Sequence, residues 1–296
     1  MRQTKFNCNV LTPMLSHGKD TKNPELRPTE IKSLVRFIYR GLIAGNPKDV
    51  YKRESELFGD SENNASRMRI SIKANLQEED KKNIKIVSHK NFAASHIRAG
   101  FPFSIYVRSL YDEKMHSFFE KLLTLSLWLG GIGQRSRRAR GCIEIKSYEG
   151  AINSIPCTVN LNAAEFIHYL FKLINDPDIA PGKYEVRPGN IISIKRFPPE
   201  VNYPYIQKIE IGKAYQGFER LFEAIDKASH QVNLAGGSVY TGYGGGQKRM
   251  ASSVYVSAVR LSDGIHPVCI TLNPVFIDEN MKRQMDKRDA FKTMFM

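Results

Sequence analysis

The chain has few cysteines, and none of them lies near another. The four, Cys8, Cys142, Cys157 and Cys269, never form the C-x-x-C spacing of zinc sites and thiol redox motifs. The seven histidines likewise make neither H-x-x-x-H nor H-E-x-x-H. These absences argue against a disulfide framework and a dedicated metal site. We therefore predict no metal and no cofactor, with the cysteines as small buried side chains in a reducing compartment.

Long apolar runs are also missing, and acidic residues are scarce. No run of roughly eighteen apolar residues could span a membrane, and the first seven residues lack the apolar core of a signal peptide. We expect a cytoplasmic protein without a membrane partner. Lys and Arg number 44 against 30 Asp and Glu, which gives a net charge of +14. This excess favours a polyanionic partner such as nucleic acid.

Glycine and arginine are concentrated in one stretch, Gly130–Gly141, which we call the glycine-arginine loop. It holds four glycines and four arginines in twelve residues. The loop is not a dinucleotide-binding fingerprint, because Ser136 stands at the third glycine position and the order is helix, then strand. It is not a phosphate-binding P-loop either, since Tyr243 stands where the nearest candidate needs lysine. Glycine lets a backbone approach a ligand closely, and arginine binds phosphate in a forked geometry.

Hydrophobic periodicity predicts the elements of the first half. Thr29 is predicted to cap the first helix, and Trp128 to lie in the core. The first half is expected to contain strands at 4–11, 67–74, 84–87, 101–109 and 142–147, helices at 30–44 and 112–129, and a short helix that ends near Gly59. Without the short helix and the surface segment around 78–91, the order is β-α-β-β-α-β, which is the ferredoxin-like arrangement. This arrangement also underlies RNA recognition modules, although their aromatic signature is absent here.

The second half also places a glycine-rich stretch, Gly236–Arg249, between a helix and a strand. Its tyrosines Tyr240 and Tyr243 are predicted either to stack on bases or to pack the stretch against its own domain. We expect helices at 162–175, 215–229 and 278–293, the last of them basic, and strands at 183–187, 190–196, 204–211, 253–260 and 266–272. The fold class is therefore α+β, with domains at 1–151 and 152–296.

Several blocks of the sequence resemble the RAMP superfamily, and within it the first RAMP subunits of type III-B CRISPR (Cmr) effectors. The blocks are Leu11–Leu15, Glu25–Arg40, Glu56–Gly59, Gly131–Arg138 and Arg249–Val254. The chain departs from the family at two positions, with Ser33 and Ala139 where glycine is usual. The resemblance implies two ferredoxin-like domains and a non-catalytic, RNA-binding subunit in antiviral defence. It also implies a position near the guide's 3′ end, with guide CRISPR RNA, target single-stranded RNA and other RAMP subunits as partners.

The residues expected to contact RNA come from these blocks. The first helix supplies Lys32, Arg36 and Arg40 on one face, with Arg27 before it. The glycine-arginine loop supplies backbone approach and guanidinium groups, and the second glycine-rich stretch adds two cations. The full set is Arg27, Lys32, Arg36, Arg40, Gly131, Gly133, Arg135, Arg137, Arg138, Arg140, Lys248 and Arg249.

Two alternatives of other classes stay open. Some RAMP proteins are metal-independent endoribonucleases that process guide-RNA precursors, and His17 in the loop after the first strand could supply the acid–base group. Asp20 in the same loop could resemble the cleaving aspartate of backbone RAMP subunits, although the local pattern does not match theirs. An exposed loop side chain of this kind is more often inert. The other alternative is a basic protein whose surface chiefly contacts neighbouring subunits.

Overall fold

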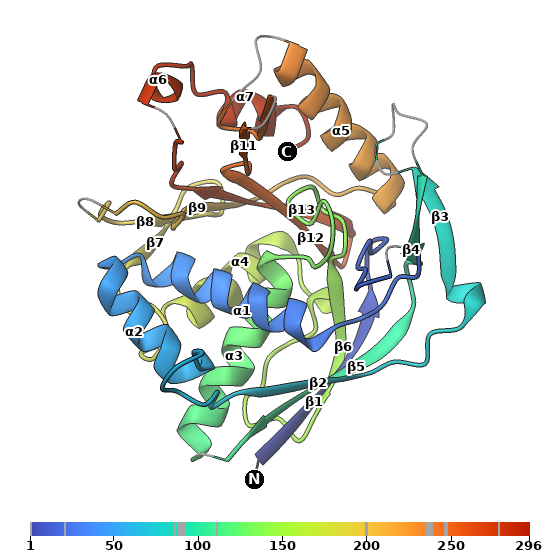
Figure 1. Ribbon diagram of the computed structural model, residues 1–296, viewed down its shortest axis with the longest axis vertical. Helices are drawn as coiled ribbons and strands as arrows, with labels where there is room; N and C mark the ends of the chain where they lie inside the picture. Colours follow the sequence, from blue (N-terminus) through green and yellow to red (C-terminus); the bar gives the residue numbers. More distant parts are fainter. Residues whose placement is uncertain are drawn as a thin grey trace.

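Two antiparallel sheets, with helices between and around them, make up this α+β chain (Figure 1). The computed structural model describes residues 2–20, 22–85, 87, 93–110, 112–198, 201–234, 239–245, 248–277 and 279–296. Each sheet is built mainly from one half of the chain.

The first sheet has the strand order β2-β5-β1-β6. Its strands are β1 (Arg2–Val10), β2 (Arg69–Lys73), β5 (Pro102–Ser109) and β6 (Ile143–Glu149). Two helices, α1 (Pro28–Ile43) and α3 (Glu113–Leu129), connect them, so the chain order is β1-α1-β2-β5-α3-β6. In β1 and β5 buried residues alternate with more exposed ones, which gives the sheet one face on the core and one toward solvent.

Additional elements interrupt this order. Helix α2 (Pro47–Phe58) follows α1. Between β2 and β5 in the chain, a hairpin of β3 (Lys81–Lys85) and β4 (Ala93–Ile97) projects from the molecule (Figure 1). The sequence predicts a strand at 84–87 but no strand corresponding to β4. The Thr29 cap is also wrong: α1 starts two residues earlier than predicted, with Pro28 as its first residue and Arg27 as an N-cap without a side-chain bond. Proline is favoured there because its φ is already helical.

The second sheet has the order β12-β13-β9-β8-β7. Its strands are β7 (Tyr184–Arg187), β8 (Ile191–Ile194), β9 (Ile206–Ile211), β12 (Val254–Leu261) and β13 (Gly264–Leu272), with helices α4 (Ala163–Ile174) and α5 (Phe218–Leu234). From Ala151 onward, the described chain forms no strand before α4. The order is therefore α-β-β-β-α-β-β, which differs from the β-α-β-β-α-β order of the first half.

The second glycine-rich stretch forms a short hairpin where the structure describes it. Strands β10 (Tyr243–Gly245) and β11 (Lys248–Met250) pair in antiparallel register. Gly236, Gly237 and Ser238, together with Gly246 and Gln247, lie outside the described residues. Tyr240 is buried, edge-on to Phe276 and beneath the guanidinium of Arg288. This tyrosine packs within its own half.

The single basic helix predicted at 278–293 is wrong. Two short helices, α6 (Glu279–Lys282) and α7 (Arg288–Thr293), stand in its place. The Asp286 carboxylate accepts a hydrogen bond from the backbone N–H of Arg288 at 3.0 Å. Such local side-chain bonds compete with helix continuation and favour a new start.

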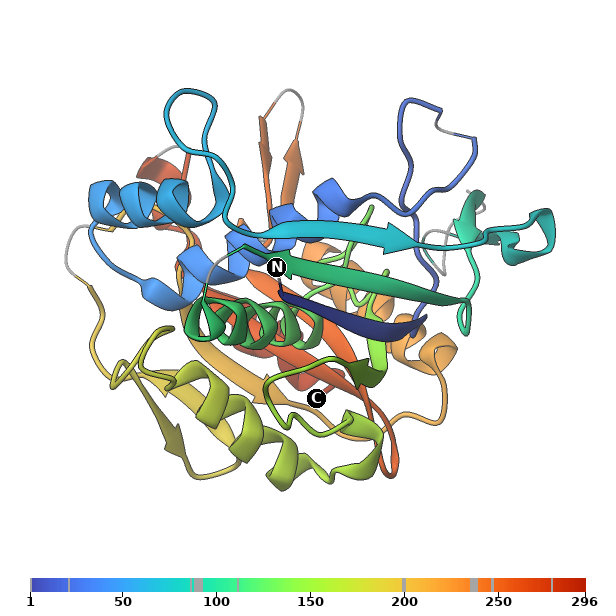
Figure 2. The ribbon, with the colours of Figure 1, turned by 90° about the horizontal axis from the view of Figure 1, so that it is seen from below.

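Helix α3 lies between the two sheets and joins the halves into one core (Figures 1 and 2). From Phe118 to Leu129 only Lys121 is not buried, and a helix that is buried all round is typical of the interior of a large core. Trp128 is buried against Phe166 of α4, as predicted. One contiguous cluster of buried side chains runs from Phe6 to Leu272. The predicted boundary at residue 151 therefore crosses a shared core.

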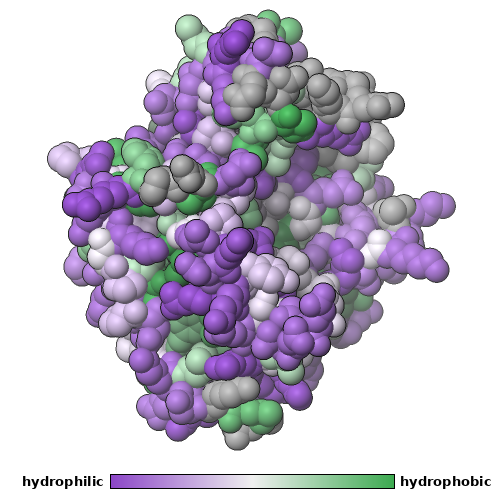
Figure 3. Space-filling view, turned by 60° about the vertical axis from the view of Figure 1, so that its left-hand side comes forward, coloured by the Kyte–Doolittle hydropathy of each residue, from purple (hydrophilic) through white to green (hydrophobic). Residues whose placement is uncertain are grey.

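The face toward the viewer in Figure 3 is mostly hydrophilic, and its apolar residues form small separate patches. Among the described helices, none combines the length and apolar character needed to cross a membrane.

Candidate functional site

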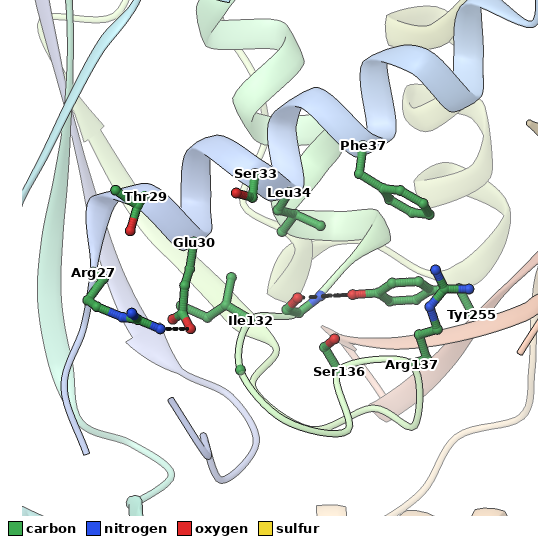
Figure 4. Close-up of a pocket in the computed structure, with 12 residues that line it drawn as sticks. Arg27, Thr29, Glu30, Ser33, Leu34, Phe37, Ile132, Ser136, Arg137 and Tyr255 are labelled. Atoms are coloured by element: carbon green, nitrogen blue, oxygen red, sulfur yellow. Dashed lines mark hydrogen bonds and ion pairs between the residues drawn. The ribbon is translucent and has the colours of Figure 1, made fainter. Parts of the chain in front are cut away.

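A cavity of about 470 Å³ lies between the N-terminal half of α1 and the glycine-arginine loop (Figure 4). We call it the main cavity. It brings together two blocks that are about 100 residues apart in the sequence, and β12 adds one aromatic side chain. It is lined by Arg27, Thr29, Glu30, Ser33, Leu34, Phe37, Gly131, Ile132, Gly133, Ser136, Arg137 and Tyr255.

The loop is held from one side by the segment that follows β1. The backbone N–H of Gln134 donates to the Leu15 carbonyl at 2.8 Å, and that of Gly141 donates to the Pro13 carbonyl at 3.0 Å. Gly133 has φ +84°, and a Cβ there would lie 2.5 Å from the Leu15 oxygen. Gly133, which the sequence predicts as an RNA contact, is thus also required for close packing against the backbone of Leu15. The resemblance blocks Leu11–Leu15 and Gly131–Arg138 meet in this contact.

The other side of the loop pairs with β12, the edge strand of the second sheet. The Ala139 N–H donates to the Val256 carbonyl at 2.7 Å, and the Val256 N–H donates to the Arg137 carbonyl at 3.2 Å. Ala139 has φ +60°, a left-handed conformation that favours glycine. The backbone conformation therefore accounts for the family's usual glycine at this position. The loop covers an edge that would otherwise leave strand groups unpaired.

Two of the four loop arginines point into the protein. Arg138 donates to the carbonyls of Val254 (3.2 Å) and Thr241, and burial lowers its pKa to about 10. Arg140 is 2% exposed and donates to the Asp226 carboxylate of α5 at 2.9 Å. Its guanidinium lies 3.7 Å from the ring centre of Phe222. Arg135, half-buried with φ +59°, reaches the other oxygen of Asp226 at 3.2 Å. These arginines fasten the loop to the second half.

Arg137 is the loop arginine that lines the main cavity. Its guanidinium lies 5.4 Å from the ring centre of Phe37 and 5.7 Å from that of Tyr255, and it donates to the Ser252 carbonyl (Figure 4). Burial lowers its pKa, but an arginine remains charged at neutral pH. The Tyr255 hydroxyl donates to the Gly131 carbonyl at 2.9 Å and accepts from the Gly131 N–H at 3.0 Å. One end of the cavity is thus aromatic and cationic.

The middle of the cavity offers donors to an anion. Gly133 and Ser136 line it, and within the described chain their backbone N–H groups donate to no acceptor. Ser33 on α1 is exposed at the same cavity. At the far end Arg27 bonds the Glu30 carboxylate at 2.7 Å (Figure 4). Unused backbone N–H groups beside a cation suit a phosphate group.

The predicted stripe on α1 divides into two parts. Arg36 and Arg40 both bond the buried carboxylate of Glu54 on α2, the latter at 2.7 Å. Their side chains are 28% and 40% exposed, and they fix α2 against α1. Lys32 forms no ion pair with another residue in the described ranges, and it lines cavities beside the main one.

The remaining predicted residues lie farther from the main cavity. Arg249 is exposed and lines a smaller cavity that shares Arg137 with the main one, whereas the structure describes only the backbone of Lys248. The ring nitrogens of His17 are buried and have no partner among the described residues. Asp20 is exposed and accepts hydrogen bonds from the Asn23 side-chain amide and from the Lys22 N–H, which lower its pKa. Asp20 therefore orders its own turn.

Of the twelve cavity residues, Arg27, Gly131, Gly133 and Arg137 were predicted as RNA contacts. Among the eight that were not, Phe37, Ser136 and Tyr255 bear most on the chemistry of the cavity. Phe37 and Ser136 lie inside the resemblance blocks, but no charge or glycine marks them. Tyr255 belongs to an alternating strand, where an aromatic residue is ordinarily part of the core. Only the pairing of the loop with β12 brings it to the cavity. No group of three potential metal-ligating side chains occurs in the described part of the chain.

Comparison with known proteins points in one direction. Residues 7–144 match the family model of the RAMP superfamily. Over 184 residues the chain is 23% identical to a protein named CRISPR system Cmr subunit Cmr1-2 from Pyrococcus furiosus, a match that covers 49% of this chain and 96% of that protein.

Solved structures extend the similarity over nearly the whole chain. The apo crystal structure of Cmr1 from Pyrococcus furiosus superposes with a TM-score of 0.62 at 14% identity, covering 99% of this chain and 96% of that one. A chain of the type III-B Cmr-beta complex bound to cognate target RNA superposes with a TM-score of 0.63 at 10% identity, covering 99% of both chains. At these identities the likeness is one of fold.

Proposed function

We propose, because residues 7–144 match the family model of the RAMP superfamily, that this chain belongs to that superfamily and is a non-catalytic, RNA-binding subunit of a type III-B CRISPR effector complex. The named relative is a Cmr subunit, and the matched complex is described as bound to cognate target RNA. We place the chain near the 3′ end of the guide, beside other RAMP subunits, in the cytoplasm. Free cysteines and a net charge of +14 fit this role.

For the fold we propose one ferredoxin-like unit and one variant of it, instead of the two equivalent ferredoxin-like domains that the sequence predicts. The first sheet has the strand order that a β-α-β-β-α-β chain gives when its two halves interleave, and we propose that it is a ferredoxin-like unit. We propose that the second half is a variant of this unit in which no strand precedes α4. Helix α3 serves both sheets.

The main cavity carries the RNA proposal. It combines the free backbone N–H groups of Gly133 and Ser136 with the Arg137 guanidinium and the Phe37 ring. Such a set binds a phosphate by hydrogen bonds and charge, and holds an adjacent base by stacking, without reading its identity. Binding is therefore expected to tolerate sequence and to weaken with salt.

The test introduces a negative charge at the cavity without removing a loop contact. Ser33→Glu places a carboxylate at an exposed position of α1 that lines the cavity. We expect it to weaken single-stranded RNA binding about tenfold, which corresponds to about 1.4 kcal/mol. The matched control is Ala164→Glu, which adds the same charge at an exposed position of α4. Fluorescence anisotropy at two salt concentrations measures both.

Equal affinities for the two variants would rule out this cavity as the RNA site. The same reactions, run with chelator, report on RNA integrity. A discrete cleavage product that disappears in His17→Ala would replace the proposal with an endoribonuclease. Simultaneous loss of Arg135, Arg137 and Arg138 is a poorer test, because these side chains hold the loop to α5 and β12.

A further inference from the structure

A second cavity, of about 410 Å³, adjoins the main one at the start of α1. Thr29 lines both cavities. The second cavity is lined by Pro28, Thr29, Lys32, Ser66, Met68, Arg69, Ile70, Ser71 and Arg108. Three of these nine residues are cations and none is acidic. Nothing in the lining neutralises this charge.

The two arginines of this cavity oppose each other across neighbouring strands. Arg69 of β2 and Arg108 of β5 are register partners, so their side chains share one face of the first sheet. Like charges in this arrangement repel and destabilise the pair of strands. Arg108 donates to the side-chain oxygen of Gln3. Arg69 is exposed and, within the described chain, pairs with no carboxylate. An anion between these arginines would remove the repulsion.

An aromatic side chain stands next to this pair on the same face. The Arg108 guanidinium lies 5.7 Å from the ring centre of Tyr106, two residues along β5. The outward residues of β2 and β5 are all at least partly exposed. Lys5, the register partner of Tyr106 on β1, is paired with the Glu149 carboxylate at 2.9 Å, so Arg69 and Arg108 supply the charge of this face. A cationic face with one accessible ring is typical of surfaces that bind single-stranded nucleic acid.

We propose that Lys32, Arg69 and Arg108 bind the phosphate backbone of single-stranded RNA that continues from the main cavity past Thr29, with Tyr106 stacking on one of its bases. This inference rests on the proposed function and extends it. A short RNA strand that fills only the main cavity would not reach this face, whereas a longer strand would extend onto it. The second site therefore adds affinity in proportion to RNA length and leaves sequence preference unchanged.

The experiment measures binding of a ladder of single-stranded oligouridylates of increasing length by fluorescence anisotropy. The test variant is Arg69→Gln, and the matched control is Lys73→Gln, which removes one charge from the same face of the same strand at an exposed position outside the cavity. We expect Arg69→Gln to weaken binding of long strands about tenfold and to lower the salt slope by about 0.7. Short strands should bind as they do to the unaltered protein.

A separate variant tests the proposed stacking of Tyr106 on a base. Tyr106→Leu is expected to weaken binding of long oligouridylates but not of abasic strands of the same length. Unaltered affinity of Arg69→Gln at every length, with Ser33→Glu still defective, would overturn this inference and leave the proposed function standing. If Arg69→Gln weakened binding of an acidic peptide but not binding of RNA, the inference would also be overturned, because the face would then belong to a protein partner. If neither variant affects RNA, both proposals fall.

Discussion

Gly133 shows at the scale of a residue how the loop depends on backbone packing. Its φ is +84°, and a Cβ added to it would lie 2.5 Å from the Leu15 carbonyl oxygen, so there is no room for a side chain. We expect Gly133→Ala to lower the free energy of unfolding by about 2 kcal/mol or more, from the left-handed conformation and the overlap together. Chemical denaturation measures this change.

The control for Gly133 is Gly182→Ala. Gly182 has φ +68°, and a Cβ there would meet nothing within 4 Å. It should lose only the conformational part, about 1 kcal/mol. Equal losses at both positions would mean that contact with Leu15 contributes nothing.

Asp226 gives a second prediction for a single residue. It is fully buried and bonds both Arg135 and Arg140. Asp226→Asn leaves Arg140 charged inside the protein without its counter-ion, so we expect a loss of about 3 kcal/mol in thermal or chemical denaturation. Glu185→Gln breaks an exposed pair with Arg187 and should cost less than about 1 kcal/mol. A loss for Asp226→Asn no larger than this would contradict the role of Asp226 as an anchor.

The loop arginines also show what the sequence could predict and what it could not. Composition placed glycines and arginines in a functional loop, and Gly133 and Arg137 do line the cavity. The inward direction of Arg140 depends on Asp226 of α5, and that of Arg138 depends on the Val254 and Thr241 carbonyls, all about 90 or more residues away in the sequence. A single charged residue in an amphipathic helix gives no signal that it will be buried beneath a distant loop.

Helices α1, α3 and α4 were predictable at the scale of elements because their periodicity is strong and they are long. Strand β4 and the divided C-terminal helix were not. The β3–β4 hairpin is a charged excursion, and α6 and α7 are too short for periodicity. In both places local side-chain bonds and contacts with distant segments decide the structure, as with Met14 beside Ile97.

The contact between α3 and β1 predicts a pH dependence. His116 of α3 is fully buried and bonds the Thr4 hydroxyl at 2.9 Å, with the Glu120 carboxylate at 3.6 Å. Burial, the larger effect, lowers its pKa from 6.5, against the opposing attraction of Glu120. Below about pH 6.5 the unfolded chain therefore binds a proton that the folded protein disfavours. The resulting stability is complete above that pH and is lost as pH falls toward the folded pKa.

Denaturation midpoints measured between pH 7 and 5 test this dependence. We expect His116→Gln to flatten the fall in stability, whereas His168→Gln, which replaces an exposed histidine of α4, should follow the unaltered protein. Burial also lowers the pKa of His96, so a smaller slope remains in both variants. Parallel curves for His116→Gln and the unaltered protein would contradict the assignment.

Cooperative unfolding follows at the scale of the whole molecule. The shared core around α3 predicts that both halves unfold together, although the sequence suggested a boundary at residue 151. Trp128 is the only tryptophan and lies where α3 meets α4. Its fluorescence and the far-ultraviolet circular dichroism should therefore give the same denaturation midpoint.

Separate transitions, or a fragment 1–151 that folds alone with native stability, would contradict this prediction. The fragment should instead expose the face of α3 that packs against β12 and α4. Exposed apolar surface of this kind favours aggregation.

Since α3 joins the halves and Arg140 ties the loop to α5, we expect both walls of the main cavity to move together. We therefore expect no closing movement of these walls around a bound strand. A strand must be threaded or laid along walls already at their final separation, so little of the binding energy is spent on reshaping the protein. Association should then be set by electrostatic encounter and its dependence on ionic strength, with no slow closing step after the first contact.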